Sequence, residues 1–364
     1  MSLDRTSVEE NETAPTVCRR SVMCWSAAAL AAIGLAGALK PSLARAVDAT
    51  PEAMSDFEWG EFDAMLAAVA PNVSMLAADL SDGTVSPIHS VSPELVQPVG
   101  SSFKLWVLYA LSKLVEDGTI NWEDEVEIQD QYRSVPGGDL RYVQAGTRFT
   151  VRYLAERMIQ KSDNTATDHV LFLVGRENAE AAMAEVGHHD PSLNTPLFAT
   201  REFAMLKFAA TDEERAAYLA ASVEERRRIL EEDIAAIPFE ALSDLEQTAP
   251  IEIDTFEWFA NRTDLALTMN ALLAQSQKPG LRPVAEILSL ETQLEFDGSI
   301  WPYVGFKGGS EMGVLSGTWL MQSMDGRYFV YSVGFSDPDA ALDMGAAVAA
   351  MNTGRDLLGA VAQS

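Results

Sequence analysis

Segments with strand character occur at the two ends of the chain, and the long stretch between them has the pattern of helices. Near the N-terminus, residues 73–80 and 85–91 flank Asp82-Gly83, a pair typical of hairpin turns. Near the C-terminus, three more segments have strand composition: 301–307, 313–321 and 328–335. Strands at both ends with helices between them predict an α+β fold, in which an antiparallel sheet is built from N- and C-terminal strands.

Helical periodicity marks the rest of the chain. Residues 55–70 place Trp59, Phe62 and Leu66 on one stripe, as expected for a helix that packs against a sheet. Further helices are predicted at 103–115, 150–158, 165–174, 176–186, 200–207, 263–276, 283–290 and 339–360. The sheet should therefore be flanked by helices and lie beside an all-helical subdomain.

We predict one catalytic domain over residues 47–364. Its α/β part comprises 51–100 and 296–364, and its helical part comprises 101–295. The acidic segment 211–250 interrupts the helical part with two tandem Thr/Ser-x-x-Glu capping boxes, so two short helices are expected there. This insert is either a lid beside the site or a surface elaboration.

Residues 1–46 have the composition of an export signal. The pair Arg19-Arg20 precedes an apolar segment over 27–39, and an Ala-x-Ala cleavage motif ends at Ala46. Paired arginines resemble a twin-arginine signal, and the apolar run is shorter than the about 20 residues that span a bilayer. We expect cleavage near Ala46 and a periplasmic or extracellular mature protein with no stable membrane span.

Composition limits the partners and the kinds of catalysis that this chain can have. The net charge is −28, with 54 acidic residues against 26 basic ones, which argues against nucleic acid as a partner. Cys18 and Cys24 both fall within the predicted signal, so disulfides and thiol catalysis are excluded from the mature chain. The four histidines show no zinc-ligand spacing, at His89, His169, His188 and His189. We expect a monomer with no metal and no cofactor.

The motif Ser101-x-x-Lys104 opens a strongly apolar predicted helix. A serine with a lysine one turn later on the same face is an arrangement that makes a hydroxyl nucleophilic. Two further motifs follow in order: Ser162-Asp163-Asn164 in a polar break between helices, and Lys307-Gly308-Gly309-Ser310 at the end of a predicted strand.

This ordered trio resembles the penicillin-recognising serine hydrolases, and specifically the class A β-lactamases, whose pattern is S-x-x-K, S-D-N and K-T-G. The resemblance covers most of the mature chain, because the sheet–helices–sheet order agrees as well. It implies a β-lactamase/transpeptidase-like fold and a small-molecule β-lactam or other acyl substrate.

The resemblance and the chemistry together suggest roles. Ser101 would attack a carbonyl carbon and form an acyl-enzyme, Lys104 would accept or orient its proton, and Ser162 would relay a proton to the leaving group. The substrate would be held by Asn164 and by the cation of Lys307. Gly309 and Ser310 are also expected to bind the substrate. The backbone N–H groups of Ser101 and Ser310 would form the oxyanion hole. Asp163 is expected to cap a helix.

Two departures from the class A pattern bear on turnover. Class A enzymes carry a glutamate base in a loop reading E-x-x-L-N, and the nearest match here is Asp190-Pro191-Ser192-Leu193-Asn194. Asp190 is therefore the candidate base for deacylation, with an ordinary Asp-Pro turn as the alternative interpretation. At the middle of the third motif, Gly308 lacks the hydroxyl that helps to bind the lactam carboxylate.

Three functions remain open on the sequence. The first is a serine β-lactamase-type hydrolase that opens a β-lactam amide through an acyl-enzyme on Ser101. The second is a serine esterase or D-alanyl-D-alanine peptidase of the same fold. The third is a non-hydrolytic penicillin-binding or sensor protein that is acylated once and not released.

Overall fold

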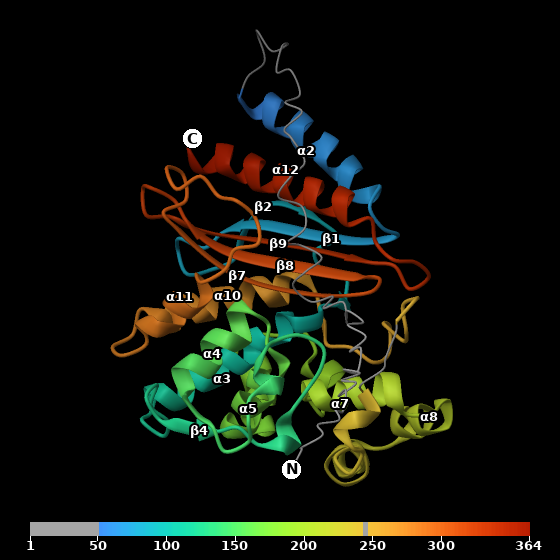
Figure 1. Cartoon of the computed structure of the whole chain (residues 1–364). Coiled ribbons are helices and arrows are strands. Elements are labelled where there is room, and N and C mark those ends of the chain that lie inside the picture. The colour runs from blue at the N-terminus through green and yellow to red at the C-terminus, as the bar shows by residue number, and fades with distance from the viewer. Residues whose placement is uncertain (1–50, 243–246) are drawn as a thin grey trace, which may run out of the picture.

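The computed structural model describes residues 51–242 and 247–364, with side chains from residue 58 onward. The predicted export signal over 1–46 and both cysteines lie outside the described residues. A sheet separates two helical layers: α2 and α12 cover one face, and α10, α11 and the larger helical region lie on the other (Figure 1). Among the described helices, none has the length and apolar character required to cross a membrane.

The main sheet has five antiparallel strands in the order β2-β1-β9-β8-β7. Their bounds are β1 Asn72–Asp79, β2 Ser86–Val91, β7 Tyr303–Glu311, β8 Val314–Gln322 and β9 Tyr328–Ser336. Asn72 pairs with Ser336, so the N-terminal hairpin joins the C-terminal strands directly. The predicted α+β fold with one antiparallel sheet from both ends of the chain is confirmed.

One face of the sheet is covered by α2 (Pro51–Ala67) and α12 (Met344–Ala362). Phe62 of α2 and Tyr331 of β9 are fully buried there, and a Cβ added at Gly354 of α12 would lie 2.7 Å from the Phe62 ring and 2.3 Å from the Tyr331 hydroxyl. Helix and sheet therefore pack so closely at this point that only a glycine fits.

The predicted helix at 339–360 begins later in the structure. Asp343 caps α12 by accepting a hydrogen bond from Ala346 N at 3.0 Å. Upstream, Asp337 accepts from Asp339 N and Ala340 N and so forms a separate turn. Several aspartates in this segment are able to cap a helix, and the local hydrogen bonds select the last of them.

The helical region is built around α3 (Lys104–Glu116), which is buried along most of its length. Helices around it are α4 (Val151–Gln160), α5 (Asn164–Val174), α6 (Arg176–Glu185), α7 (Thr200–Ala204), α10 (Arg262–Ser276) and α11 (Arg282–Leu288). The predicted helix over 200–207 changes to a π-helical segment, η5 (Met205–Ala209), after its first turns.

Short elements that have no periodic signal complete the fold. They are the 3₁₀ turns η1 (Gly100–Phe103), η2 (Asp130–Tyr132), η3 (Leu140–Tyr142), η4 (Pro191–Asn194) and η7 (Phe239–Leu242), and the strand pairs β3 (Gln97–Pro98) with β6 (Phe259–Ala260) and β4 (Glu125–Glu127) with β5 (Arg148–Thr150). The β3–β6 pair matters most here, because β3 leads directly into η1, the turn that contains Ser101.

The acidic insert forms helices as predicted. Thr211 caps α8 (Asp212–Ala220) and Glu214 bonds back to Thr211 N at 2.7 Å, which completes a capping box. Ser222 caps α9 (Val223–Arg228), which continues into the π-helical η6 (Ile229–Ile234). Ion pairs from Arg227 to Glu177 and Glu180 hold α9 against α6.

Replacement of Phe62 by alanine is expected to lower the free energy of unfolding by about 3–5 kcal/mol, because the ring is fully buried between α2, α12 and the sheet. Met65→Ala, on the same helix but 40% exposed, should change it by less than about 0.5 kcal/mol. Equilibrium urea unfolding of both variants measures the difference, and equal effects would contradict this packing.

Candidate active site

Ser101 lies in η1, the turn between β3 and α3. The turn is fixed from both sides: Pro98 pairs with Phe259, and Val99 N donates to Trp258 O at 2.8 Å. Gly100 has a φ of +50°, which favours glycine immediately before Ser101, the predicted nucleophile. Ser101 is partly accessible, whereas Lys104, one turn later, is fully buried.

The buried ammonium of Lys104 contacts the second motif. Lys104 Nζ donates to Ser162 O at 2.7 Å, to Ser162 Oγ at 3.0 Å and to Asn164 Oδ1 at 2.7 Å. Three acceptors therefore orient one amine between two of the predicted site residues. The first and second motifs, which are far apart in the sequence, form one polar cluster.

The second motif is held by the connection between α4 and α5. Ser162 has a φ of +52°, and Asp163 caps α5 by accepting from Ala166 N at 2.9 Å. Asp163 also accepts from Leu140 N at 3.0 Å, so its carboxylate ties a neighbouring loop to the helix. The carboxylate of Asp163 thus makes capping contacts, as the sequence suggests.

The third motif also contacts Ser162. Lys307 Nζ donates to Ser162 Oγ at 3.1 Å and to Gly308 O at 2.6 Å, and only 3% of Lys307 is exposed. In the structure, residues 307–310 lie inside β7, which continues to Glu311, whereas the sequence predicts that the strand ends at this motif. Two lysine ammonium groups therefore converge on one serine hydroxyl.

Burial changes the acidity of both lysines. Desolvation lowers the pKa of Lys104 to about 7, although the carboxylates of Asp163 and Asp168 oppose the shift. Desolvation also places the pKa of Lys307 well below its usual value, and the neighbouring Lys104 charge adds to that effect. A buried pair of amines disfavours a double positive charge, so a neutral amine is accessible near neutral pH.

The strand β7 lies directly against the nucleophile turn. A Cβ added at Gly309 would lie 2.1 Å from Val99 O and 2.4 Å from Ser101 N, and one added at Gly100 would lie 3.0 Å from Ser310 N. These neighbours are backbone atoms, which cannot rotate away. Glycine at 309 therefore permits the approach that brings the backbones of Ser101 and Ser310 together.

A cleft of about 380 Å³ opens beside these groups. Its lining residues are Ile159, Gln160, Lys161, Ser162, Gln293, Phe306, Lys307, Gly308, Gly309, Ser310 and Ser316. A Cβ at Gly308 would lie 2.7 Å from the Phe306 ring, which stacks on Trp319 with centroids 4.9 Å apart. The stacked ring thus occupies the space that a hydroxyl-bearing side chain at 308 would need.

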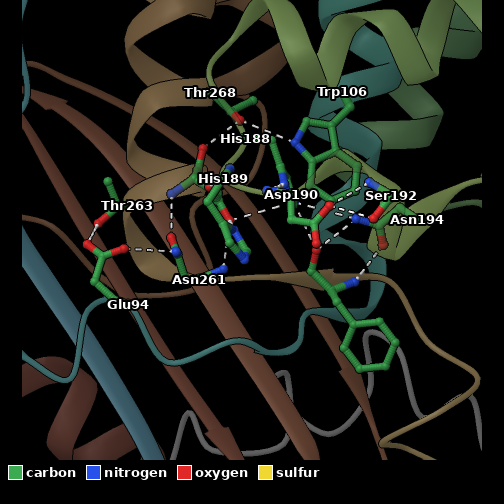
Figure 2. A network of polar contacts seen from close by, with 12 residues as sticks. Glu94, Trp106, His188, His189, Asp190, Ser192, Asn194, Asn261, Thr263 and Thr268 are labelled. Carbon is green, nitrogen blue, oxygen red and sulfur yellow. Dashed lines mark hydrogen bonds and ion pairs between the residues drawn. The ribbon is translucent and has the colours of Figure 1, made fainter.

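Asp190 lies in a different set of contacts (Figure 2). Its carboxylate accepts from Ser192 N at 3.0 Å and from Ser192 Oγ at 2.6 Å, and these bonds lower its pKa. Asn194 pairs with Phe259 through both amide atoms. The described contacts of Asp190 include none of the three motifs, so its predicted role in deacylation stays a prediction.

The same network contains the one cluster of possible metal ligands among the described residues, His188, His189 and Asp264, whose ligand atoms lie within 4.8 Å of one another. The Asp264 carboxylate accepts from Asn261 N, the N-cap residue of α10, at 2.9 Å; it also accepts from His189 N and contacts His189 Nδ1, both at 2.7 Å. His188 Nε2 lies 3.0 Å from Phe259 O. These groups satisfy one another and attach the loop with Asp190 to α10 and β6.

Several buried polar residues near the motifs are not apparent from the sequence. Asp168 accepts from Thr200 N at 2.7 Å and from Arg201 N at 2.9 Å, so α7 begins directly behind α5. Burial raises the pKa of Asp168 to about 7. A second group, Lys207, Glu257 and Glu311, lies behind the nucleophile turn. The members of this second group share no motif or period. For Asp168, the one local signal is its position four residues after Asn164.

The comparisons with known proteins agree with this geometry. A family model described as the β-lactamase enzyme family matches residues 60–235. With the fold, this match confirms the resemblance predicted from the three motifs. The match and the fold together support a β-lactamase-like serine enzyme family for this chain. The family implies a small-molecule substrate.

Solved structures show the same fold at low sequence identity. A β-lactamase from Sphaerobacter thermophilus is 17% identical with a TM-score of 0.57, and the match covers 83% of this chain and 97% of that one. A β-lactamase from Chitinophaga pinensis is 13% identical with a TM-score of 0.57, covering 84% and 99%. PBP-A is 15% identical with a TM-score of 0.53, covering 81% and 95%. Among curated protein sequences, none matches this chain.

Gly309→Ala should reduce the rate at which Ser101 reacts with an acylating probe by about 10²-fold or more, because the added methyl group would separate β7 from the nucleophile turn. Gly298→Ala is the matched control, since nothing lies within 4 Å of a Cβ at that position. Stopped-flow acylation compares the two, and a Gly309→Ala enzyme with the unaltered rate would contradict the close approach.

Proposed function

We propose that this enzyme opens β-lactam amides through an acyl-enzyme on Ser101. The observation that carries the proposal is the convergence of Lys104 Nζ and Lys307 Nζ on Ser162 Oγ, at 3.0 Å and 3.1 Å, beside a partly accessible Ser101. This arrangement supplies a base, a proton relay and a cation within one buried cluster, which are the groups that acyl transfer to a serine requires.

In the proposed reaction, neutral Lys104 takes the hydroxyl proton of Ser101 as Ser101 Oγ bonds to the lactam carbonyl carbon. The negative charge on the carbonyl oxygen is stabilised by the backbone N–H groups of Ser101 and Ser310. The C–N bond then breaks, and Ser162 gives its proton to the leaving nitrogen. Lys104 returns a proton to Ser162, which its hydrogen bond to Ser162 Oγ supports.

Substrate recognition is proposed to rest on charge. Lys307, in the charged form that an adjacent carboxylate favours, and the hydroxyl of Ser310 would bind a substrate carboxylate, and Asn164 would hold an amide of the acyl group. Since Gly308 offers no hydroxyl, the Phe306 ring beside it would instead give the cleft an apolar wall. We also propose export before function, on the strength of the predicted signal at 1–46.

Slow release of the acyl group is the second candidate behaviour, and the environment of Asp190 favours it. Hydrolysis of the acyl-enzyme requires a base that activates water. The Asp190 carboxylate is held by Ser192, and its contacts within the described part of the chain include none of the three motifs. The protein would then act as a penicillin-binding or sensor protein. One of the similar solved structures is a PBP-A variant described as an acyl-enzyme complex with penicillin G.

Incubation with a chromogenic cephalosporin, followed by intact-mass spectrometry, tests the proposal. Wild-type protein should gain one acyl adduct, Ser101→Ala should gain none, and Ser102→Ala is the neighbouring control that should react. Absence of both an adduct and colour-producing turnover would overturn the proposal for β-lactams. Turnover of short acyl esters or D-alanyl-D-alanine peptides in that case would identify the esterase or peptidase alternative.

Acylation should become faster as the pH rises through about 7, because Lys104 acts in its neutral form and its pKa lies near that value. Lys104→Arg, which stays charged, should lose about 10²–10⁴-fold at every pH. Single-turnover acylation rates between about pH 6 and about pH 8 measure the profile. A flat wild-type profile in this range would show that Lys104 is not the base.

Asp190→Asn is expected to change the lifetime of the acyl adduct by less than about threefold, since a side chain that Ser192 already holds is not free to orient water. The decay of the adduct, followed by intact mass after removal of excess substrate, gives the lifetime. A lifetime at least about tenfold longer in the variant would instead establish Asp190 as the base.

A further inference from the structure

A buried group of charged side chains lies behind the nucleophile turn, and the proposed mechanism does not use it. Glu257, just before β6, is 3% exposed. Its Oε2 accepts from Gly100 N at 3.2 Å and from Trp258 N at 2.9 Å. One carboxyl oxygen thus touches the residue that precedes Ser101 and fixes the segment that pairs with the turn.

The second member is Glu311, the last residue of β7, which directly follows Ser310. Its charge acts on Glu257 and contributes, after burial, to the raised pKa of that residue. Glu311 Oε1 forms an ion pair with Lys207 of η5. Its other oxygen, Oε2, is buried and accepts no hydrogen bond from any of the described residues.

The contacts of Lys207 complete the cluster. Lys207 is fully buried, donates to Phe256 O at 3.3 Å and lies 4.9 Å above the centre of the Phe203 ring. The charged and titratable groups that face Glu257 are therefore Glu311 from β7 and Lys207 from η5.

Charge balance fixes the protonation of this group. Glu257 and Lys207 are buried and the Glu311 side chain is only 12% exposed, so two carboxylates and one ammonium would leave a net negative charge in a poorly solvated place, which is unfavourable. A single proton between Glu257 and Glu311 makes the group neutral and gives the buried Glu311 Oε2 a donor. Burial, and next the charge of Glu311, raise the pKa of Glu257, which is consistent with this assignment.

We propose that the proton shared by Glu257 and Glu311 holds the two oxyanion donors, the N–H groups of Ser101 and Ser310, at their working separation. The shared proton would join the carboxyl group that accepts from Gly100 N, immediately before Ser101, to Glu311, immediately after Ser310. Glu257 and Glu311 are thus positioning residues, and their role rests on the function proposed above.

Loss of the shared proton has a defined consequence. Two adjacent carboxylates repel each other, so the end of β7 moves away from the turn and the oxyanion is no longer held by both donors. Acylation should then decline on the alkaline side of its pH profile. Deprotonation of Lys307 would also produce an alkaline decline, so the test has to separate the two groups.

Glu257→Gln separates them, because its amide donates permanently to Glu311 while its oxygen still accepts from Gly100 N. We expect this variant to acylate within about threefold of wild type at neutral pH and to lose the alkaline decline. Glu257→Ala should lower kcat by about tenfold or more with little change in KM. Glu213→Gln, on the exposed surface of α8, is the control. An alkaline decline that persists unchanged in Glu257→Gln would overturn the proposal.

An infrared measurement tests the shared proton without any substrate. The difference spectrum between wild type and Glu257→Gln should contain the carbonyl band of one protonated carboxyl group at about pH 8, where ordinary carboxyls are ionised. Absence of that band would contradict the proposal. This measurement needs no turnover, so its result does not depend on the activity assay. A protein that reacts with no acyl substrate would refute the proposed function, and the infrared band would still show whether the proton is shared.

Discussion

The contact between β7 and the nucleophile turn is the constraint on which the rest of the site depends. Backbone atoms of Gly309 lie so near Val99 and Ser101 that no other side chain fits between them. This approach determines where Lys307 reaches Ser162, because Lys307 is two residues earlier on the same strand. The sheet therefore supplies one wall of the site, the helical region supplies the other, and the nucleophile turn joins them.

Electrostatics in this enclosed region follow from burial more than from individual ion pairs. Lys104 and Lys307 are both withdrawn from water, and both have lowered pKa values for that reason. Behind the turn, burial raises the pKa of Glu257, because burial disfavours the charged form of an acid as well. A protein that is strongly acidic overall thus keeps two amines near Ser101 and Ser162 in a poorly solvated place, where small changes in protonation have large effects.

Much of the fold and the core of the site were predictable from the sequence. The hairpin at Asp82-Gly83, the strands at both ends and the three motifs all carry local signals, and the structure confirms the fold. The cluster of Lys207, Glu257 and Glu311 was not predictable, because its members come from three distant segments without a shared period or motif. The two-residue strands β3 and β6 were missed because a pair so short has no alternation to detect.

The position of β9 in the sheet has a consequence for how the chain folds. β9 lies between β1 and β8, so the first strand to be synthesised has one permanent neighbour that emerges from the ribosome long after it. Until residues Tyr328–Ser336 are made, β1 has an open edge, and β7 has no sheet to place it against the nucleophile turn. Such long-range pairing slows folding, and β7 is placed against the turn that contains Ser101 only after β9 has joined β1 and β8.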